Sequence, residues 1–250
     1  MSDLLKFAPK KVVMVIEKKC CHKCGSEQIV KNGSNGSGNP KYKCKSCGFG
    51  GVFQTVRKSE EFRETVVRLA QERPSSRGLA RGFGISHQTA LNWIKKKARS
   101  LPDIVTTLLP AKKTDVLELD ELWSFVYSKA QKRWIWIALC RRTRQVVSFF
   151  IGDRSAQTCR KFWELIPKKY RRCRTFSDFW EAYSTVIQTG KHQSVGKESG
   201  ETCHVERWNN TLRQRICRFV RKTLSFSKSD EMHELYLHLF VYNYNLSLKN

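Results

Sequence analysis

The hydrophobic pattern of the C-terminal half predicts alternating strands and helices. Three successive segments alternate between apolar and polar positions as strands do: 116–127, 134–140 and 145–151. The segments that follow are expected to form a helix, a short strand, a helix and a longer helix: 155–166, 174–177, 179–184 and 202–215. The last of these has a continuous apolar stripe at helical spacing: Val205, Trp208, Leu212 and Ile216. A meander followed by helices and a further strand predicts an α/β domain compatible with an RNase H-like fold.

Residues 77–94 have the pattern of two helices joined by a tight turn. Ala80 is small where the helices would cross, Gly84 suits the turn, and Ser86 can cap the second helix. This pattern predicts a helix-turn-helix, which follows another helix expected at 60–71. The residues expected to face the major groove or adjacent phosphates are His87, Gln88, Thr89, Asn92, Lys95 and Lys96. A small helical hairpin with no DNA function has a similar pattern.

Four cysteines near the N-terminus have the spacing of metal ligands. They form two Cys-x-x-Cys pairs: Cys21, Cys24, Cys44 and Cys47. Strands expected at 28–31 and 41–43 would form a hairpin that brings the pairs together, and four thiolates suit a tetrahedral structural Zn²⁺. A redox dithiol or two disulfides fit less well, because there is no βαβ pattern and no oxidising context. Cys20 could replace Cys21, with a gap to Cys24 that is one residue longer.

The charge of the chain favours a polyanionic partner. Lys and Arg number 47 against 22 Asp and Glu, which gives a net charge of +25, and the basic residues are spread along the sequence. Such a charge favours nucleic acid over a membrane. The apolar runs are far shorter than the ~18 residues that span a bilayer. Because the N-terminus does not resemble a cleavable signal, we expect an intracellular protein.

Three carboxylates from separate elements are candidates for one metal site. Asp120 lies in an otherwise apolar strand, Asp178 at the C-terminal end of a later strand, and Glu206 beside the apolar stripe of a helix. Oxygen ligands suit Mg²⁺, and two ions ~3.5–4 Å apart would assist phosphoryl displacement. Taken singly, each acid has a structural explanation: an arginine pair, a helix cap or a local ion pair. Spacing alone does not exclude other acids as ligands: Glu118, Glu121 and Glu201.

The sequence around these acids resembles the acidic motifs of DDE transposases, in particular the family of insertion sequence one. The matching segments are Leu119-Asp120-Glu121-Leu122-Trp123, Ser177-Asp178-Phe179-Trp180 with Tyr183, and Val205-Glu206-Arg207-Trp208-Asn209-Asn210 with Leu212-Arg213. The run 221–229, the cysteine pairs and the helix-turn-helix pattern also resemble that family, so the resemblance covers nearly the whole chain. Members of the family often make the two halves from overlapping reading frames, whereas here one chain contains both.

The resemblance implies an activity and its residues. Asp120, Asp178 and Glu206 would be the catalytic triad, with two Mg²⁺ or Mn²⁺ ions. The protein would bind the terminal inverted repeats of an insertion sequence, cleave the 3′ ends and transfer them into target DNA. It would act as a homodimer or higher oligomer on double-stranded DNA, in the cytoplasm of a prokaryotic cell at the nucleoid. The basic residues expected to contact phosphates include Arg207, Arg213, Arg221 and Lys222.

Together these patterns predict a multidomain α/β protein. The expected domains are a zinc ribbon with an N-terminal lead, a helix-turn-helix domain, a linker, and an RNase H-like catalytic domain with a C-terminal helix: 1–52, 53–99, 100–114 and 115–250. An alternative is a DNA-binding regulator whose C-terminal domain is catalytically inactive. Another is an RNase H-like nuclease without joining activity. Three acids in matching contexts favour the enzyme over the regulator.

Overall fold

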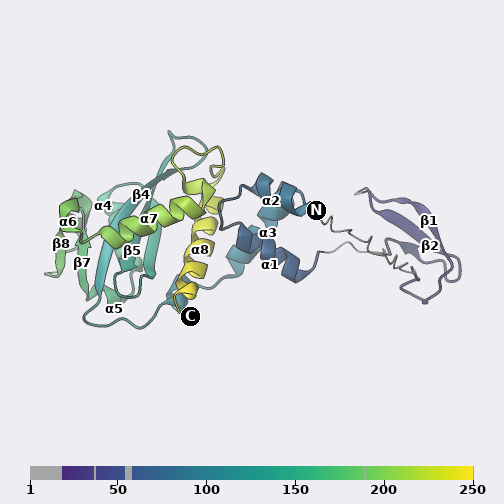
Figure 1. Ribbon diagram of the computed structural model, residues 1–250, viewed down its shortest axis with the longest axis horizontal. Coiled ribbons are helices and arrows are strands. Elements are labelled where there is room, and N and C mark those ends of the chain that lie inside the picture. Colours follow the sequence, from purple (N-terminus) through teal and green to yellow (C-terminus); the bar gives the residue numbers. More distant parts are fainter. Residues whose placement is uncertain (1–18, 37, 54–57, 189, 250) are drawn as a thin grey trace, which may run out of the picture. The chain divides into compact units, whose positions relative to one another are not determined.

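The protein divides into two compact units, residues 1–58 and residues 59–250 (Figure 1). The computed structural model describes residues 19–249 apart from 37, 54–57 and 189. The N-terminal lead expected before the zinc ribbon therefore lies outside the described residues except for Lys19, as does most of the connection between the units. In the described ranges, no helix is both long enough and apolar enough to cross a membrane.

The first unit is a small antiparallel sheet beside the cysteine pairs. Its strands have the order β1-β2-β3: β1 (Ile29–Ser34), β2 (Pro40–Cys44) and β3 (Gly50–Gly51). The hairpin expected from the sequence is present, and its register pairs Ile29 with Cys44. The buried core consists of Cys21, Tyr42, Cys44 and Phe53. Because so small a core gives little stability by itself, a domain of this size ordinarily needs a metal or cross-links.

The second unit begins with three helices: α1 (Glu60–Leu69), α2 (Ser76–Phe83) and α3 (His87–Ser100). Serine side chains cap all three helices at their N-termini. Gly84 joins α2 to α3 with φ of +60°, a backbone conformation that glycine adopts at little cost. Ala90 and Ile94 of α3 are fully buried, so one face of this helix packs against a core.

A mixed five-stranded sheet forms the centre of the second unit, in the order β6-β5-β4-β7-β8. The strands are β4 (Val116–Phe125), β5 (Lys132–Cys140), β6 (Val146–Gly152), β7 (Arg174–Ser177) and β8 (His192–Ser194). β4, β5 and β6 form the expected antiparallel meander, whereas β7 runs parallel to β4 and β8 runs parallel to β7. Sequence analysis missed β8, because its three residues are polar and half-exposed at the edge of the sheet.

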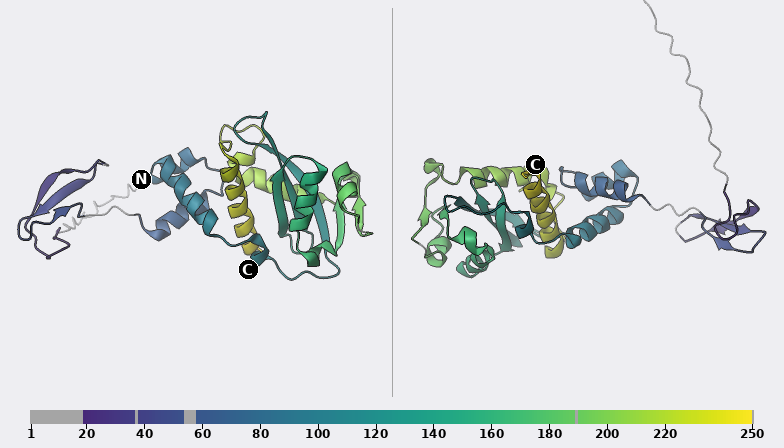
Figure 2. Two further views of the ribbon diagram at one scale, coloured as in Figure 1. Left: turned by 180° about the vertical axis from the view of Figure 1, so that it is seen from behind. Right: turned by 90° about the horizontal axis from the view of Figure 1, so that it is seen from below.

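Helices cover both faces of this sheet (Figures 1 and 2). One face packs against α4 (Ala156–Leu165), α5 (Lys168–Arg171) and α6 (Glu181–Val186), and the other against α7 (Cys203–Arg215) and α8 (Asp230–Ser247). Short 3₁₀ helices complete the unit: η1 (Ile104–Thr107), η2 (Lys197–Ser199) and η3 (Cys217–Phe219). The stripe predicted for α7 is confirmed, because its apolar members are all 2% exposed or less.

Strand β4 separates the two cores by the alternation of its side chains. Leu117 and Leu119 contribute to the core under α4, α5 and α6, whereas Leu122 contributes to the core under α7 and α8. Because successive strand residues point to opposite faces, Glu118 and Asp120 lie on the α7 side. Glu118 and Asp120 therefore lie on the face covered by the helix that carries Glu206.

Candidate active site

Asp120 lies in β4, and Asp178 directly follows the last residue of the neighbouring parallel strand β7. Glu118 pairs with Phe176 in the β4–β7 register, so Asp178, two residues beyond Phe176, comes level with Asp120. The Asp178 side chain is 44% exposed. Its Oδ1 accepts a hydrogen bond of 3.0 Å from the backbone N–H of Trp180, which turns the chain at the end of β7. The helix cap considered for this acid is instead a contact within the turn that precedes α6, and Oδ2 lies 3.8 Å from Arg154 Nη2.

Helix α7 is tied to Asp120 by an amide. Asn209 Nδ2 donates a hydrogen bond of 2.7 Å to Asp120 Oδ2, and the backbone N–H of Glu121 donates one of 2.9 Å to Oδ1. No arginine pairs with Asp120 among the described residues, in contrast to the structural explanation considered from the sequence. Glu206 lies one helical turn before Asn209, on the same side of α7. Its Oε1 accepts a hydrogen bond of 3.0 Å from the hydroxyl of Thr202.

The charges of Asp178 and Glu206 act on Asp120. Burial raises the pKa of Asp120 to about 6, and the negative charges of Asp178 and Glu206 raise it further, against the hydrogen bonds that lower it. The carboxylate oxygens of Asp120, Asp178 and Glu206 do not all lie within 4.8 Å of one another, whereas the four cysteine sulfurs do. Asp178 and Glu206 therefore influence Asp120 electrostatically, but the oxygens of the three acids do not form a compact set of metal ligands.

A fourth acid, Glu121, lies on the other face of β4 and pairs with Arg154. Its Oε2 accepts a hydrogen bond from Arg154 Nε at 3.1 Å and forms an ion pair with Nη2 at 3.0 Å, and this Nη2 lies 3.8 Å from Asp178 Oδ2. The guanidinium group stacks between two indole rings, 4.6 Å from the Trp134 centroid and 3.9 Å from that of Trp180. Burial raises the pKa of Glu121 to about 7. Arg154 thus links Asp178 to a buried carboxylate behind it.

The turn that presents Arg154 is firmly built. It joins β6 to α4, and Asp153 Oδ1 accepts hydrogen bonds from the backbone N–H of Ser155 at 3.2 Å and from its hydroxyl at 2.6 Å. The Trp136 indole donates to the Asp153 carbonyl at 2.9 Å. A Cβ atom on Gly152 would lie 2.7 Å from a methyl group of Thr158, so glycine is required for α4 to approach the strand.

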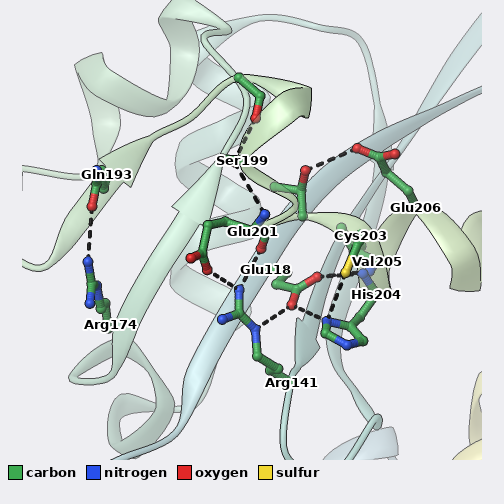
Figure 3. Close-up of polar contacts among 12 residues, drawn as sticks. Glu118, Arg141, Arg174, Gln193, Ser199, Glu201, Cys203, His204, Val205 and Glu206 are labelled. Carbon is green, nitrogen blue, oxygen red and sulfur yellow. Dashed lines mark hydrogen bonds and ion pairs between the residues drawn. The ribbon is translucent and has the colours of Figure 1, made fainter.

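Glu118 anchors the start of α7 (Figure 3). This fully buried carboxylate accepts hydrogen bonds from the backbone N–H groups of His204 at 2.9 Å and Val205 at 3.1 Å, and from Arg141 Nε at 2.7 Å. His204 Nδ1 lies 2.7 Å from Oε1, the oxygen that also accepts from Arg141. Burial raises the pKa of Glu118, whereas Arg141 lowers it. Arg141 also pairs with Glu201, so two acids that spacing could not exclude as ligands have structural partners.

The basic residues expected at DNA phosphates fall into two groups. Arg207, Arg221 and Lys222 are exposed. Arg213 is half-buried and donates to the carbonyl of Trp123 at 3.4 Å; burial lowers its pKa, and the charge of Arg221 lowers it further.

The residues expected to read DNA lie on α3. His87, Gln88, Asn92 and Lys96 are exposed, and Thr89 is half-buried beside Ser86. Lys95 differs from them, because its Nζ forms a 2.7 Å ion pair with Glu231 of α8. Its charge is therefore already partly compensated within the protein.

The four cysteines of the two Cys-x-x-Cys pairs meet as a compact cluster. Their sulfur atoms all lie within 4.8 Å of one another, and the Cys21–Cys47 and Cys24–Cys44 pairs are 3.6 Å apart. A tetrahedral Zn²⁺ with bonds of ~2.3 Å separates its sulfurs by about 3.8 Å, so the donors fit this ion. The N–H of Cys47 lowers the pKa of Cys44 to about 6, against the effect of burial. Cys20 is not a member of the cluster.

Comparison with known proteins gives a consistent result. Residues 115–245 match the family model described as IS1 transposase. The insertion element iso-IS1n protein InsB of Shigella dysenteriae is 40% identical over 126 residues, which cover 50% of this chain and 93% of that protein. The insertion element IS1 protein InsB of Shigella flexneri is 35% identical over 117 residues, 47% of this chain and 86% of that protein. The IS1 4 protein InsB of Escherichia coli (strain K12) is 34% identical over 117 residues, 47% of this chain and 68% of that protein.

The family match and the relatives define the class of protein as a transposase. The chain belongs to the IS1 transposase family. Enzymes of this DDE class carry out phosphoryl transfer on DNA, which implies DNA binding and a divalent metal. The resemblance stated from the sequence motifs is therefore confirmed.

Three residues around the acids were not in the set of site residues expected from the sequence. Asn209 could have been found, because it lies three residues after Glu206 on the same helix face. Thr202, four residues before Glu206, gives the same kind of signal. Arg154 lies 24 positions before Asp178 and is brought to it only by the sheet, so the sequence contains no local signal for it.

Proposed function

We propose that the chain is the transposase of an insertion sequence, which binds the terminal inverted repeats, cleaves the 3′ ends and joins them to target DNA. Asp120, Asp178 and Glu206 are its catalytic acids. The observation that carries the proposal is the geometry of β4. Asp178 directly follows the neighbouring strand β7 and comes level with Asp120, and Asn209 ties α7 to Asp120 itself.

The donor set fits Mg²⁺ or Mn²⁺. All three ligands offer carboxylate oxygens, which hard divalent cations prefer. Burial and mutual repulsion raise the pKa of Asp120, and a divalent cation would relieve that repulsion. When two cations are bound, they supply activation of the attacking oxygen and stabilisation of the leaving oxygen.

The protein's own side chains provide positioning and neutralise charge, which account for most of the catalysis in phosphoryl transfer. Asn209 fixes one oxygen of Asp120, and the N–H of Trp180 fixes one oxygen of Asp178. The exposed Arg207 and Arg221 neutralise DNA phosphates, together with Lys222 and with Arg213 at the edge of the acid cluster.

The N-terminal part binds DNA in this proposal. Helices α2 and α3 act as a helix-turn-helix over residues 53–99, with His87, Gln88, Thr89 and Asn92 at the major groove and Lys95 and Lys96 at phosphates. The cysteine cluster holds a structural Zn²⁺ in a ribbon over residues 1–52. Residues 100–114 link these parts to an RNase H-like catalytic domain, residues 115–250. Exposure of most of these α3 side chains supports the first assignment.

Because joining acts on both ends of an element, we propose a homodimer or higher oligomer on DNA. Each chain contributes one acid cluster. The relatives belong to bacterial insertion elements, so the site of action is the nucleoid in the bacterial cytoplasm.

The experiment that tests this function is an end-cleavage and joining assay. The protein is incubated with Mg²⁺, labelled element-end DNA and a target plasmid. Asp178→Asn keeps an oxygen for the Trp180 N–H but removes the charge, and Glu164→Gln on the exposed face of α4 is the matched control. We expect 3′-end cleavage and joined product from the wild type and the control, and loss of both by at least about 10³-fold in Asp178→Asn.

The other two candidate functions predict different products. A DNA-binding regulator would retain the end DNA without cutting it in any variant. A nuclease would cut the DNA without forming a joined product. Either result would contradict the proposed function.

A further inference from the structure

Thr202 occupies the N-cap position of α7, yet its hydroxyl does not cap the helix. A threonine at this position ordinarily accepts a hydrogen bond from the backbone N–H of the second or third helical residue. Thr202 has φ of −114° and ψ of 11° and makes no such bond. Instead the hydroxyl donates to Glu206 Oε1 at 3.0 Å, and the residue is only 6% exposed. The buried Thr202 side chain therefore contacts Glu206 rather than the backbone of α7.

Glu118 performs the capping in place of Thr202. Its Oε2 accepts from the N–H groups of His204 and Val205, the second and third residues of α7, at 2.9 and 3.1 Å. Arg141, which directly follows the neighbouring strand β5, compensates the buried charge (Figure 3). Because Glu118 of β4 accepts hydrogen bonds from the backbone N–H groups at the start of α7, the Thr202 hydroxyl does not have to cap the helix.

The Thr202 hydroxyl donates to one carboxylate oxygen of Glu206, and the other oxygen of that carboxylate accepts no hydrogen bond among the described residues. In the described ranges, Thr202 supplies the hydrogen bond to Glu206 Oε1, and no hydrogen bond reaches Glu206 Oε2. A glutamate side chain has several freely rotating bonds, and fixing them costs conformational entropy. A carboxylate that ligates a metal is commonly held by a hydrogen bond from a residue outside the ligand set, which sets its orientation.

We propose that Thr202 is a positioning residue for the divalent-cation site. Its hydroxyl holds Oε1 of Glu206 and thereby restricts the carboxylate to a rotamer that keeps Oε2 available to the cation. This inference rests on the proposed function, in which Glu206 is a metal ligand. It assigns to Thr202 an effect on metal affinity that a helix cap would not have.

The test compares cation binding by Thr202→Val, Thr202→Ser and Glu206→Gln. Valine has the shape of threonine without the hydroxyl, whereas serine keeps the hydroxyl. The full-length protein is used in its zinc-loaded form without DNA, and free Mn²⁺ is measured by electron paramagnetic resonance. We expect Thr202→Val to weaken Mn²⁺ binding about 10- to 100-fold, the range for outer ligand-orienting groups, and Thr202→Ser to bind as the wild type does.

A melting curve separates positioning from capping. Since Glu118 caps α7, Thr202→Val should unfold at nearly the wild-type temperature. A cap residue would instead lose about 1 kcal/mol of stability in that variant. Such a loss with unchanged Mn²⁺ affinity would overturn the positioning role.

Glu206→Gln separates the ligand role of Glu206 from the positioning role of Thr202. If this variant loses Mn²⁺ binding while Thr202→Val binds normally, the inference about Thr202 is wrong and the proposed acid cluster stands. If Glu206→Gln binds Mn²⁺ as the wild type does, the assignment of Glu206 as a ligand fails, and the role of Thr202 fails with it.

Discussion

Asn209 Nδ2 donates a 2.7 Å hydrogen bond to Asp120 Oδ2, which joins the helix that carries one acid to the strand that carries another. We predict that Asn209→Asp abolishes this bond, because two carboxylates then face each other in a buried position. End cleavage should fall by at least about tenfold, and retention of end DNA in a gel-shift assay should be unchanged.

Asn210→Asp is the control for this change. Asn210 follows Asn209 but is exposed, so the variant adds the same charge to the same helix away from Asp120. It should cleave as the wild type does. Equal loss of activity in both variants would mean that the added charge on α7, rather than the contact with Asp120, is responsible.

Arg154 neutralises the buried Glu121 and approaches Asp178 with the same nitrogen. Arg154→Ala leaves the Glu121 carboxylate, which is 1% exposed, without its cation. Stability should fall by about 1–2 kcal/mol, a value reduced because Arg154 is itself partly exposed. Adding Glu121→Gln to this variant should restore most of the stability in a denaturant titration but not the cleavage activity, since Asp178 still lacks its neighbour.

Arg160→Ala, which removes an exposed arginine from α4, is the charge-matched control and should behave as the wild type does. Recovery of both stability and activity in the double variant would show that Arg154 only balances the charge of Glu121.

The basic residues near α7 should differ in their effect on DNA binding. Arg207 and Arg221 are exposed, whereas Arg215 pairs with Glu72 and the buried Arg218 stacks 4.0 Å from the centroid of Tyr236. Replacing either exposed arginine by alanine should reduce the slope of log affinity against log salt by about 0.9, the release of one phosphate contact. Arg215→Ala should leave the slope unchanged, and Arg218→Ala should chiefly lower stability. Equal salt-dependence slopes for all four variants would contradict the distinction between exposed and internally paired arginines.

The sequence predicted the fold well where the hydrophobic period was strong. The meander of β4, β5 and β6 and the buried face of α7 followed from apolar spacing. The edge strand β8 was missed, because its polar residues are held in the sheet by pairing with β7 and bury no apolar surface that a hydrophobic pattern could reveal. The start of α6 was also expected too early, because Asp178 and Trp180 form a turn before the helix begins at Glu181.

The candidate site shows the same limit. The motifs predicted the three acids as a site, but they did not predict the groups that contact these acids in the structure. Glu118 has the same spacing pattern as a ligand, and only the structure shows that its oxygens are taken by α7 and Arg141. Arg154 reaches Asp178 through strand order, which no local pattern encodes.

The stability of the second unit should depend on pH through His233. This fully buried ring lies 2.9 Å from the Ser227 hydroxyl, and burial, with the charge of Arg218, lowers its pKa to about 4. Between the ordinary pKa near 6.5 and this value, the unfolded chain binds a proton that the folded protein does not. The contribution to stability is therefore present above the ordinary pKa and is lost as the pH falls towards 4.

From pH 7 to pH 5 this one group should cost about 2 kcal/mol. The measurement is the free energy of unfolding at both pH values for the wild type and His233→Gln. Glutamine cannot titrate, so the variant should lack this component, and the difference between the two proteins isolates it from the buried acids. An identical pH dependence in both would contradict the lowered pKa.

The central claim is that Asp120, Asp178 and Glu206 bind divalent cations at one site. The most direct measurement is the position of Mn²⁺, located by its anomalous X-ray scattering in crystals of the protein with element-end DNA. The account predicts density at about 2.0–2.2 Å from oxygens of all three residues, next to the phosphate at the cleavage position. Manganese bound elsewhere, or density that involves Asp120 and Asp178 without Glu206, would contradict it.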